Sequence, residues 1–231
     1  MVIKGWKLLV VAAALIVIPL GIIGTNYVQK AYSPRPIATV VIDAGHGGVD
    51  GGVEGVKTGV FEREINLIIS KLLAKRLESV GVTAILTRKT KSGLYESIDG
   101  NFKLKDFERR KEIILNANPS AVVSIHCNKY SSPSRRGIQV FFDGTNDESR
   151  AFGNIMQEGI NKNLNLPYTH RGYSALSGDY YIVKCTNAPS IIIECGFLSN
   201  VEDEKLLVDS KYREILTYHI FSGIMQYIAT A

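Results

Sequence analysis

Short β-branched runs alternate with segments of helical periodicity along this chain. This alternation limits the possible fold classes more than any other feature of the sequence. The first run, residues 38–42, is followed by a glycine-rich stretch over 44–52. Apolar residues then recur at helical spacing from Ile65 to Val80, and a glycine stands where a helix C-terminal cap belongs. A second apolar run over 82–87 completes the pattern, which predicts a βαβ unit.

The same alternation continues to the end of the chain. Residues 88–103 lack periodicity and are expected to form a long surface loop that shapes a cleft. Further strands are predicted at 121–125, 137–142 and 191–193, and helices over 105–116, around 152–160, 201–207 and 211–228. The pattern predicts a single α/β domain, with a largely parallel, twisted sheet of about six strands flanked by helices on both faces.

The amino terminus carries an export signature. Lys4 and Lys7 precede a run from Leu8 to Ile23 that contains no charged residue. This run is shorter than the roughly 20 apolar residues of a membrane-spanning helix, and Pro19 interrupts it, so a cleaved signal peptide and an uncleaved anchor both fit. The absence of a small-x-small cleavage site and the basic flank favour the anchor. A buried core helix is the weaker interpretation, because nothing amphipathic frames the run.

The remaining chain has the composition of one globular domain. Of its 231 residues, 45% are hydrophobic and 21% charged, which is ordinary for folded proteins. We expect residues 1–36 to be a signal peptide or membrane anchor plus linker, and 37–231 to be one folded domain, exported to the extracytoplasmic face of the membrane or to the wall. The net charge of +5 suits an anionic wall or membrane surface. Because the basic residues are not clustered, we expect no nucleic acid partner.

The cysteines do not suggest a disulfide framework. Three is an odd number, and Cys127, Cys185 and Cys195 show no paired spacing. Cys127 follows His126 and Cys195 follows Glu194 directly, so on strands each thiol points away from its neighbour. We expect these two cysteines to be buried as small hydrophobic side chains and not to bind a metal.

Four polar residues stand at the ends of predicted elements. His46 follows the first strand, Glu62 begins the first helix, and His126 and Glu194 each end a strand. The carboxyl ends of strands are where sites assemble in open α/β sheets. Two imidazoles and a carboxylate form the ligand set of a hydrolytic Zn²⁺, and a second, unligated carboxylate moves protons. Structural histidines and a helix N-terminal acid remain the alternative interpretation.

Six strings in the chain resemble motifs of a known family and follow its order. They are VVIDAGHGGVDGG, FEREINL, LTR, SIHCN, RRGIQVFF and APSIIIECGFLSN. On these strings the chain resembles the zinc-dependent amidase-3 family of N-acetylmuramoyl-L-alanine amidases. The resemblance implies His46, Glu62 and His126 as Zn²⁺ ligands and Glu194 as the catalytic carboxylate. Glu64 is the alternative to Glu62, but the family's pattern of Glu followed by a basic residue matches Glu62 and Arg63.

The resemblance also implies a substrate. It predicts hydrolysis of the amide bond between the lactyl group of N-acetylmuramic acid and L-alanine of the peptidoglycan stem peptide. KLKDFERRKEIILNAN and RRGIQVFF look most like the sporulation-type branch, whose members help to make muramic δ-lactam in the spore cortex. Some such enzymes need an activating or targeting protein partner. The alternatives are a zinc peptidase acting on stem peptides and a non-catalytic wall-binding module.

Weaker candidates for substrate binding complete the predictions. Asn128 follows the SIHCN histidine closely, Arg135 and Arg136 form a basic pair, and His170 stands in a predicted loop. A solvated basic turn explains the arginines equally well. His219 is expected to lie on a helix surface or to pack there.

Overall fold

The strands of the computed structural model form one sheet with the order β2-β1-β3-β6-β4-β5. The structure describes residues 36–98 and 100–230. Neighbouring strands are parallel except for β4, which runs antiparallel to β6. The strands are β1 (Thr39–Ala44), β2 (Thr83–Leu86), β3 (Ala121–Asn128), β4 (Gln139–Phe142), β5 (Leu176–Ser177) and β6 (Ser190–Phe197). The predicted α/β domain with a largely parallel six-stranded sheet is confirmed.

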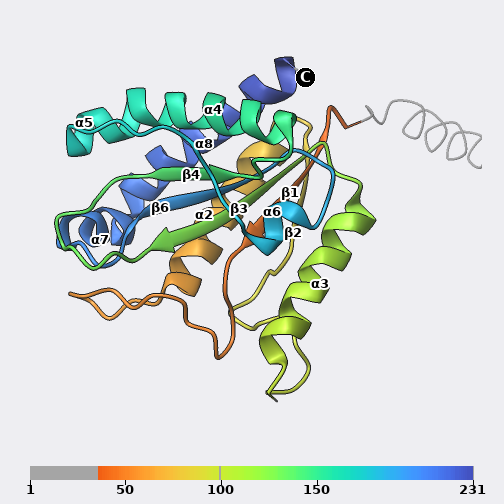
Figure 1. The fold of residues 1–231 in the computed structure, drawn as a ribbon, viewed down its shortest axis with the longest axis horizontal. Coiled ribbons are helices and arrows are strands. Elements are labelled where there is room, and N and C mark those ends of the chain that lie inside the picture. The colour runs from red at the N-terminus through yellow and green to blue at the C-terminus, as the bar shows by residue number, and fades with distance from the viewer. Residues whose placement is uncertain (1–35, 99, 231) are drawn as a thin grey trace, which may run out of the picture. The chain divides into compact units, whose positions relative to one another are not determined.

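Helices cover both faces of this sheet. In Figure 1, α8 passes behind the strands and α6 lies in front of them. Apolar residues of α2, α4 and α8 form one core cluster with the sheet, while α3 and α6 contribute to a second. The helical elements are α2 (Glu62–Glu78), α3 (Phe102–Ala117), α4 (Asp147–Ile160), the π-helix η1 (Asn161–Asn165), α5 (Leu166–Thr169), α6 (Tyr181–Lys184), α7 (Val201–Val208) and α8 (Ser210–Thr230).

Local sequence explains why these elements form. In β1, Val40 and Ile42 pack into the first cluster and Val41 into the second, because successive strand residues point to opposite faces. In α2, Ile65 and Ile69 are buried at helical spacing. Strands buried on both faces are mostly apolar, so the few polar residues they carry stand out.

Two strands are longer than predicted. β3 continues to Asn128 and β6 to Phe197, so His126 and Glu194 lie within strands and do not end them. Parallel strands pair through backbone groups whatever the side chain, so pairing outlasts the apolar run. A register irregularity follows between His126 and Asn128.

Other elements were missed or shortened by the sequence prediction. The helix predicted over 105–116 begins at Phe102. The two-residue strand β5 and the four-residue helix α6 are too short to show periodicity. The π-helix η1 follows α4 directly, and no residue at this point of the sequence marks the change of helix type.

The expectations for the amino-terminal segment fall on residues 1–35, which lie outside the described residues. Within 36–98 and 100–230, no helix is both long and apolar enough to cross a membrane. Cys127 and Cys195 are buried, Cys185 is partly buried, and all are free thiols, as predicted.

Candidate metal centre

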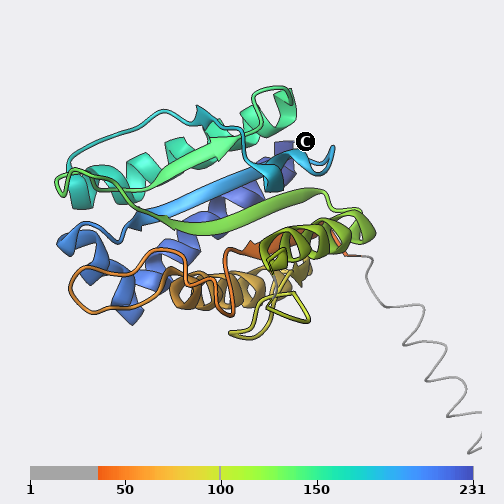
Figure 2. The same cartoon turned by 60° about the horizontal axis from the view of Figure 1, so that its bottom comes forward.

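The loop after β1 brings His46 to the carboxyl ends of β3 and β6. Figure 2 shows this orange loop beside the ends of both strands. His46 has a left-handed backbone, with φ of 62°. Its Nε2 lies 3.2 Å from Glu62 Oε2, and its Nδ1 lies 3.0 Å from Asp50 Oδ2. A carboxylate on the second ring nitrogen is the arrangement that orients a metal-binding imidazole.

Glu62 begins α2 and is almost fully buried. Oε2 accepts the backbone N–H of Val53 at 2.9 Å, and Oε1 accepts that of Cys127 at 2.9 Å. Asn66 Nδ2 donates to Oε1 at 3.2 Å. Burial alone would raise the pKa of Glu62, but hydrogen bonds and charge from His126 and His46 lower that pKa well below its usual range. The side chain is therefore an oriented carboxylate anion.

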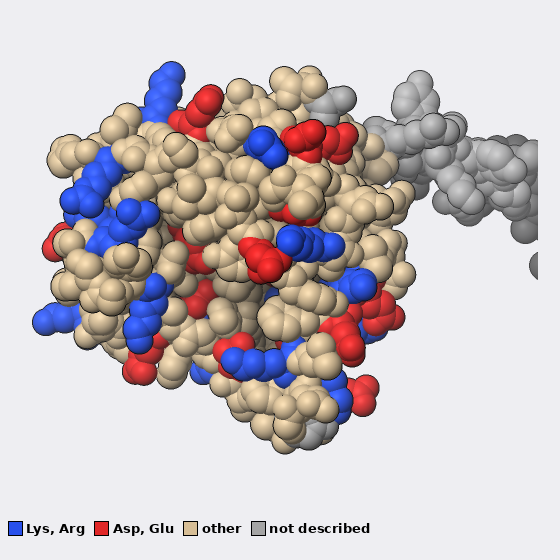
Figure 3. Space-filling view, viewed as in Figure 1, with Lys and Arg blue, Asp and Glu red and all other residues tan. Residues whose placement is uncertain are grey.

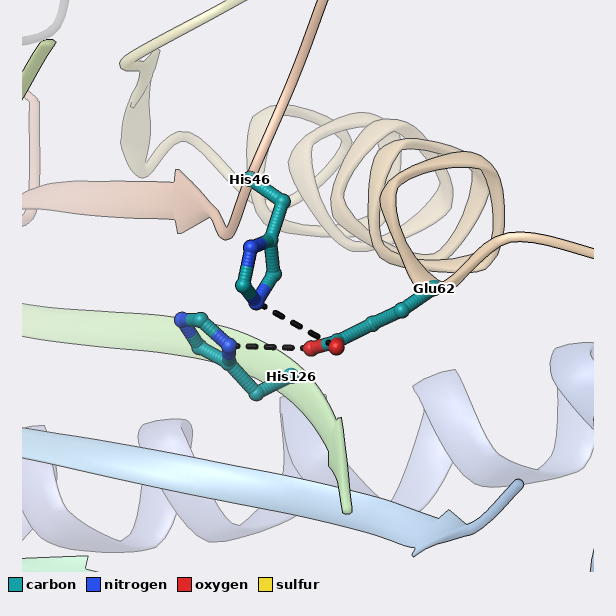
Figure 4. Close-up of side chains that lie close together, drawn as sticks. All are labelled: His46, Glu62 and His126. Carbon is teal, nitrogen blue, oxygen red and sulfur yellow. Dashed lines mark hydrogen bonds and ion pairs between the residues drawn. The ribbon is translucent and has the colours of Figure 1, made fainter. Parts of the chain in front are cut away.

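His126 completes a group of three converging side chains. Its Nδ1 lies 3.0 Å from Glu62 Oε1, and Figure 4 shows both imidazoles directed at the Glu62 carboxylate. One ligand atom from each residue lies within 4.8 Å of the others. Ligand atoms of a tetrahedral site, each ~2.1 Å from the ion, stand about 3.4 Å apart. The observed spacing and the donor set therefore fit one small divalent cation.

Glycine is required where these side chains meet. A Cβ on Gly45 would lie 2.3 Å from the Cε1 and Nε2 atoms of His126, and one on Gly52 would lie 2.4 Å from Glu62 Oε2. Gly52 also has a positive φ of 67°. The glycines of the first motif thus leave room for the two candidate ligand side chains that arrive from β3 and α2.

Glu194 lies next to this group on the neighbouring strand. It is the register partner of His126. Its Oε2 is buried and has no hydrogen-bond partner among the described residues. Burial raises the pKa of Glu194 to about 7, although the charge of His126 opposes the rise. A carboxyl group with this pKa exchanges protons readily near neutral pH.

Three of the four residues face a cleft beside α3 and α6, whereas Glu62 is buried behind them. Its walls include His46, His126 and Glu194. This face of the molecule is hollowed near its centre, with basic and acidic side chains around the hollow (Figure 3). The apolar part of the wall consists of Tyr95, Phe102, Phe107, Tyr180, Tyr181, Ile182 and Ile192. Sequence did not single out these residues, although it predicted that the loop over 88–103 shapes a cleft.

The weaker candidates lie elsewhere in the described part of the chain. Asn128 Oδ1 accepts the backbone N–H of Lys129. Arg135 stacks over Tyr173, and Arg136 Nε pairs with an Asp203 oxygen at 3.2 Å. The residues that line the cleft do not include Asn128, Arg135, Arg136 or His170. Their role in substrate binding stays a prediction.

His170 and His219 lie outside the metal group. His170 is exposed at the end of α5 and has a left-handed backbone. His219 is half-buried on α8, where it packs against Tyr218. The placement of His219 agrees with the helix packing expected from sequence, whereas His170, expected in a loop, stands at the carboxyl end of the short helix α5.

Comparison with known proteins identifies the family. The model of the family described as N-acetylmuramoyl-L-alanine amidase matches residues 40–226. The chain belongs to this amidase family. The predicted family, and with it the prediction of an enzyme that hydrolyses the lactyl amide of peptidoglycan, is confirmed.

Individual amidases resemble the chain over most of its length. The germination-specific N-acetylmuramoyl-L-alanine amidase of Bacillus subtilis (strain 168) is 29% identical over 191 residues, which are 81% of this chain and 78% of that protein. The CwlD amidase of Clostridioides difficile, solved in complex with the GerS lipoprotein, has a TM-score of 0.78 and 34% identity, covering 84% of this chain and all of that one. The catalytic domain of the CwlV amidase from Bacillus (Paenibacillus) polymyxa var. colistinus has a TM-score of 0.71 and 26% identity, covering 84% and 99%.

Proposed function

We propose that this amidase binds Zn²⁺ through His46, Glu62 and His126 and uses Glu194 as its catalytic carboxylate. The observation that carries the proposal is the convergence of the three ligand candidates within 4.8 Å, beside a buried carboxyl oxygen of Glu194 that has no partner in the described structure. Three protein ligands leave one coordination position open for chemistry. When bound, Zn²⁺ supplies Lewis-acid activation of the scissile amide.

The side chains around the ligands support this assignment. The Glu62 carboxylate is held by two backbone N–H groups and by Asn66, so it does not need to rotate to meet an ion. Asp50 Oδ2 lies 3.0 Å from Nδ1 of His46, close enough for an ion pair with the imidazole. Hydrogen bonds that orient ligands in this way raise metal affinity, and losing one typically lowers that affinity ~10–100-fold.

Glu194 would move the protons of the reaction. With a pKa of about 7, it exists as both carboxylate and carboxylic acid near neutral pH. The carboxylate accepts a proton from the attacking water, and the resulting acid donates it to the departing L-alanine nitrogen. The unpartnered Oε2 is the natural atom for both transfers, because no neighbouring group competes for it.

Fragment analysis tests the proposal. Purified chain, with Zn²⁺ and after chelation, is incubated with peptidoglycan, and the products are identified by mass spectrometry. We expect muramic acid with a free lactyl carboxylate and stem peptides with a free L-alanine amine, only in the metal-loaded sample. Cleavage between amino acids would indicate a peptidase, and full activity after complete metal removal would exclude the metal centre.

We further propose that the chain acts on the spore cortex with a protein partner. Support comes from its similarity to a germination-specific amidase and to an amidase solved with a lipoprotein. In the source organism, deletion of the gene is expected to remove muramic δ-lactam from the cortex. Normal lactam in the deleted strain would contradict the cortex role, and activity of the purified chain equal to that in spore extracts would argue against an activating partner.

Export of the domain rests on the amino-terminal sequence. Lys4 and Lys7 before an uncharged apolar run suit an export signal or anchor that places the amidase on the extracytoplasmic side. Membrane fractionation of cells, with and without residues 1–36, tests this. We expect the full chain in the membrane fraction, and loss of export without the segment; export of the truncated chain would refute it.

A further inference from the structure

Two buried arginines bind three consecutive backbone carbonyls around His46. Arg88 Nε donates to the Ala44 carbonyl at 2.9 Å, and its Nη2 donates to that of Gly45 at 3.0 Å. Arg110 Nη1 donates to the Ala44 carbonyl at 2.7 Å, and its Nη2 donates to that of His46 at 2.7 Å. Both arginine side chains are about as buried as the apolar core. The peptide planes on both sides of the His46 Cα are therefore held by guanidinium groups.

His46 depends on such contacts more than the other ligand candidates do. Glu62 lies in α2 and His126 in β3, so regular backbone hydrogen bonds fix both. His46 lies beyond the end of β1, and its φ of 62° falls in the left-handed region. That conformation is strained for a residue with a side chain, so it persists only where surrounding contacts enforce it.

The chemistry of arginine suits this task. A guanidinium group is planar and presents several donors in a fixed fork, whereas the ammonium of lysine is a single point charge. Arg110 also pairs with the carboxylates of Asp43 and Asp106, so its charge is balanced. Its fork thereby joins α3 to the strand exit.

The positive charge of Arg88, unlike that of Arg110, is not balanced by a carboxylate among the described residues. Its other bonds go to the carbonyls of Thr90 and Arg63, and no carboxylate contacts it in the described structure. Burial and the nearby charge of Arg110 lower the pKa of Arg88 to about 10. A cation buried against carbonyls alone is a costly way to stabilise a fold, since an apolar side chain fills the same space without desolvating a charge.

The geometry points to Arg88 and Arg110 as positioning residues that fix the backbone of His46, so that its imidazole faces Glu62 and His126 before a metal ion binds. This inference rests on the proposed function, because it needs an ion at these three side chains. It adds two residues that are not ligand candidates themselves, Arg88 shortly after β2 and Arg110 in α3.

Metal binding by conservative variants of the full 231-residue chain tests the inference. Arg88→Lys and Arg110→Lys keep the positive charge but lose the fork. Arg76→Lys is the control, because Arg76 pairs with Glu214 on the surface of α2 and α8. Zn²⁺ affinity is measured by competition with a chelating dye, the Co²⁺ site by visible absorption, and the melting temperature on metal-free protein.

We expect each of the two variants to bind Zn²⁺ at least about tenfold more weakly than wild type, with an altered Co²⁺ spectrum, and the control to match wild type. A fall in melting temperature with unchanged Zn²⁺ affinity and Co²⁺ spectrum would show a purely structural role and overturn the inference. If Arg110→Lys does not fold, Arg88→Lys decides alone, since it removes no carboxylate pair. A wild-type chain that binds neither ion would remove the proposed metal centre itself, which separates the two failures.

Discussion

His126 on β3 and Glu194 on β6 are direct register partners in the parallel sheet. Residues at matching positions of adjacent strands project to the same face, so the carboxyl group of Glu194 stands beside the imidazole of His126. The two residues are far apart in the sequence. Strand pairing therefore places the proposed proton-transferring group next to a proposed metal ligand.

Replacing the proposed catalytic carboxylate should separate metal binding from turnover. Glu194→Gln keeps the shape of the side chain but cannot accept a proton, so we expect kcat on peptidoglycan to fall ~10²–10⁴-fold with Zn²⁺ content unchanged. Glu202→Gln, on the exposed side of α7, is the matched control. Turnover of the Glu194 variant near the wild-type value would exclude this residue from the chemistry.

The two glutamates of FEREINL should differ in metal binding. Glu62 is buried among the ligand candidates, whereas Glu64 pairs with Lys91 on the surface. We expect Glu62→Gln to weaken Zn²⁺ binding by more than the ~10–100-fold typical of losing a ligand's hydrogen-bond partner, and Glu64→Gln to leave affinity unchanged. Equilibrium competition with a chelator measures both. The reverse order of effects would assign Glu64 as the ligand.

A single methyl group at the strand exit should disturb the centre. Gly45→Ala places a Cβ 2.3 Å from the His126 ring, so the ring must move, and we expect weaker Zn²⁺ binding and lower activity. Gly159→Ala in α4 meets no heavy atom within 4 Å and serves as the control, with stability equal or raised by up to about 1 kcal/mol. Calorimetric Zn²⁺ titration of both variants checks this, and equal affinities would contradict it.

Acid should weaken the charge network beneath the site. Burial alone would raise the pKa of Asp43, but Arg110 and the Ser124 hydroxyl lower it to about 2 from the ordinary 3.8. A depressed folded-state pKa stabilises the fold above the unfolded value, and this contribution disappears as pH falls from about 4 towards 2. The shift corresponds to about 2 kcal/mol. Urea unfolding of wild type and Asp43→Asn should show a stability difference at pH 6 that shrinks by about this amount near pH 2; a difference independent of pH would refute it.

The sequence predicted most of the fold because its signals are local. Apolar runs in β1 and β3, and helical spacing in α2, report burial directly through residue type and period. The ends of β3 and β6 were misjudged, because polar residues such as His126 and Glu194 interrupt the apolar pattern without interrupting backbone pairing. The short elements β5 and α6 carry too few residues for any period to appear.

The candidate site divides in the same way. Sequence by itself determined which residue types are present, and the ordered motifs identified the family and gave His46, Glu62, His126 and Glu194 as candidate site residues. Only the tertiary structure decided that the first three meet within 4.8 Å and that Arg88 and Arg110 hold the His46 backbone. It also decided that the aromatic residues of the loop, α3 and α6 wall the cleft, whereas Arg135, Arg136 and His170 do not. Side-chain identity is encoded along the chain, but distance between remote residues is set by strand register and helix packing, which depend on the whole core at once.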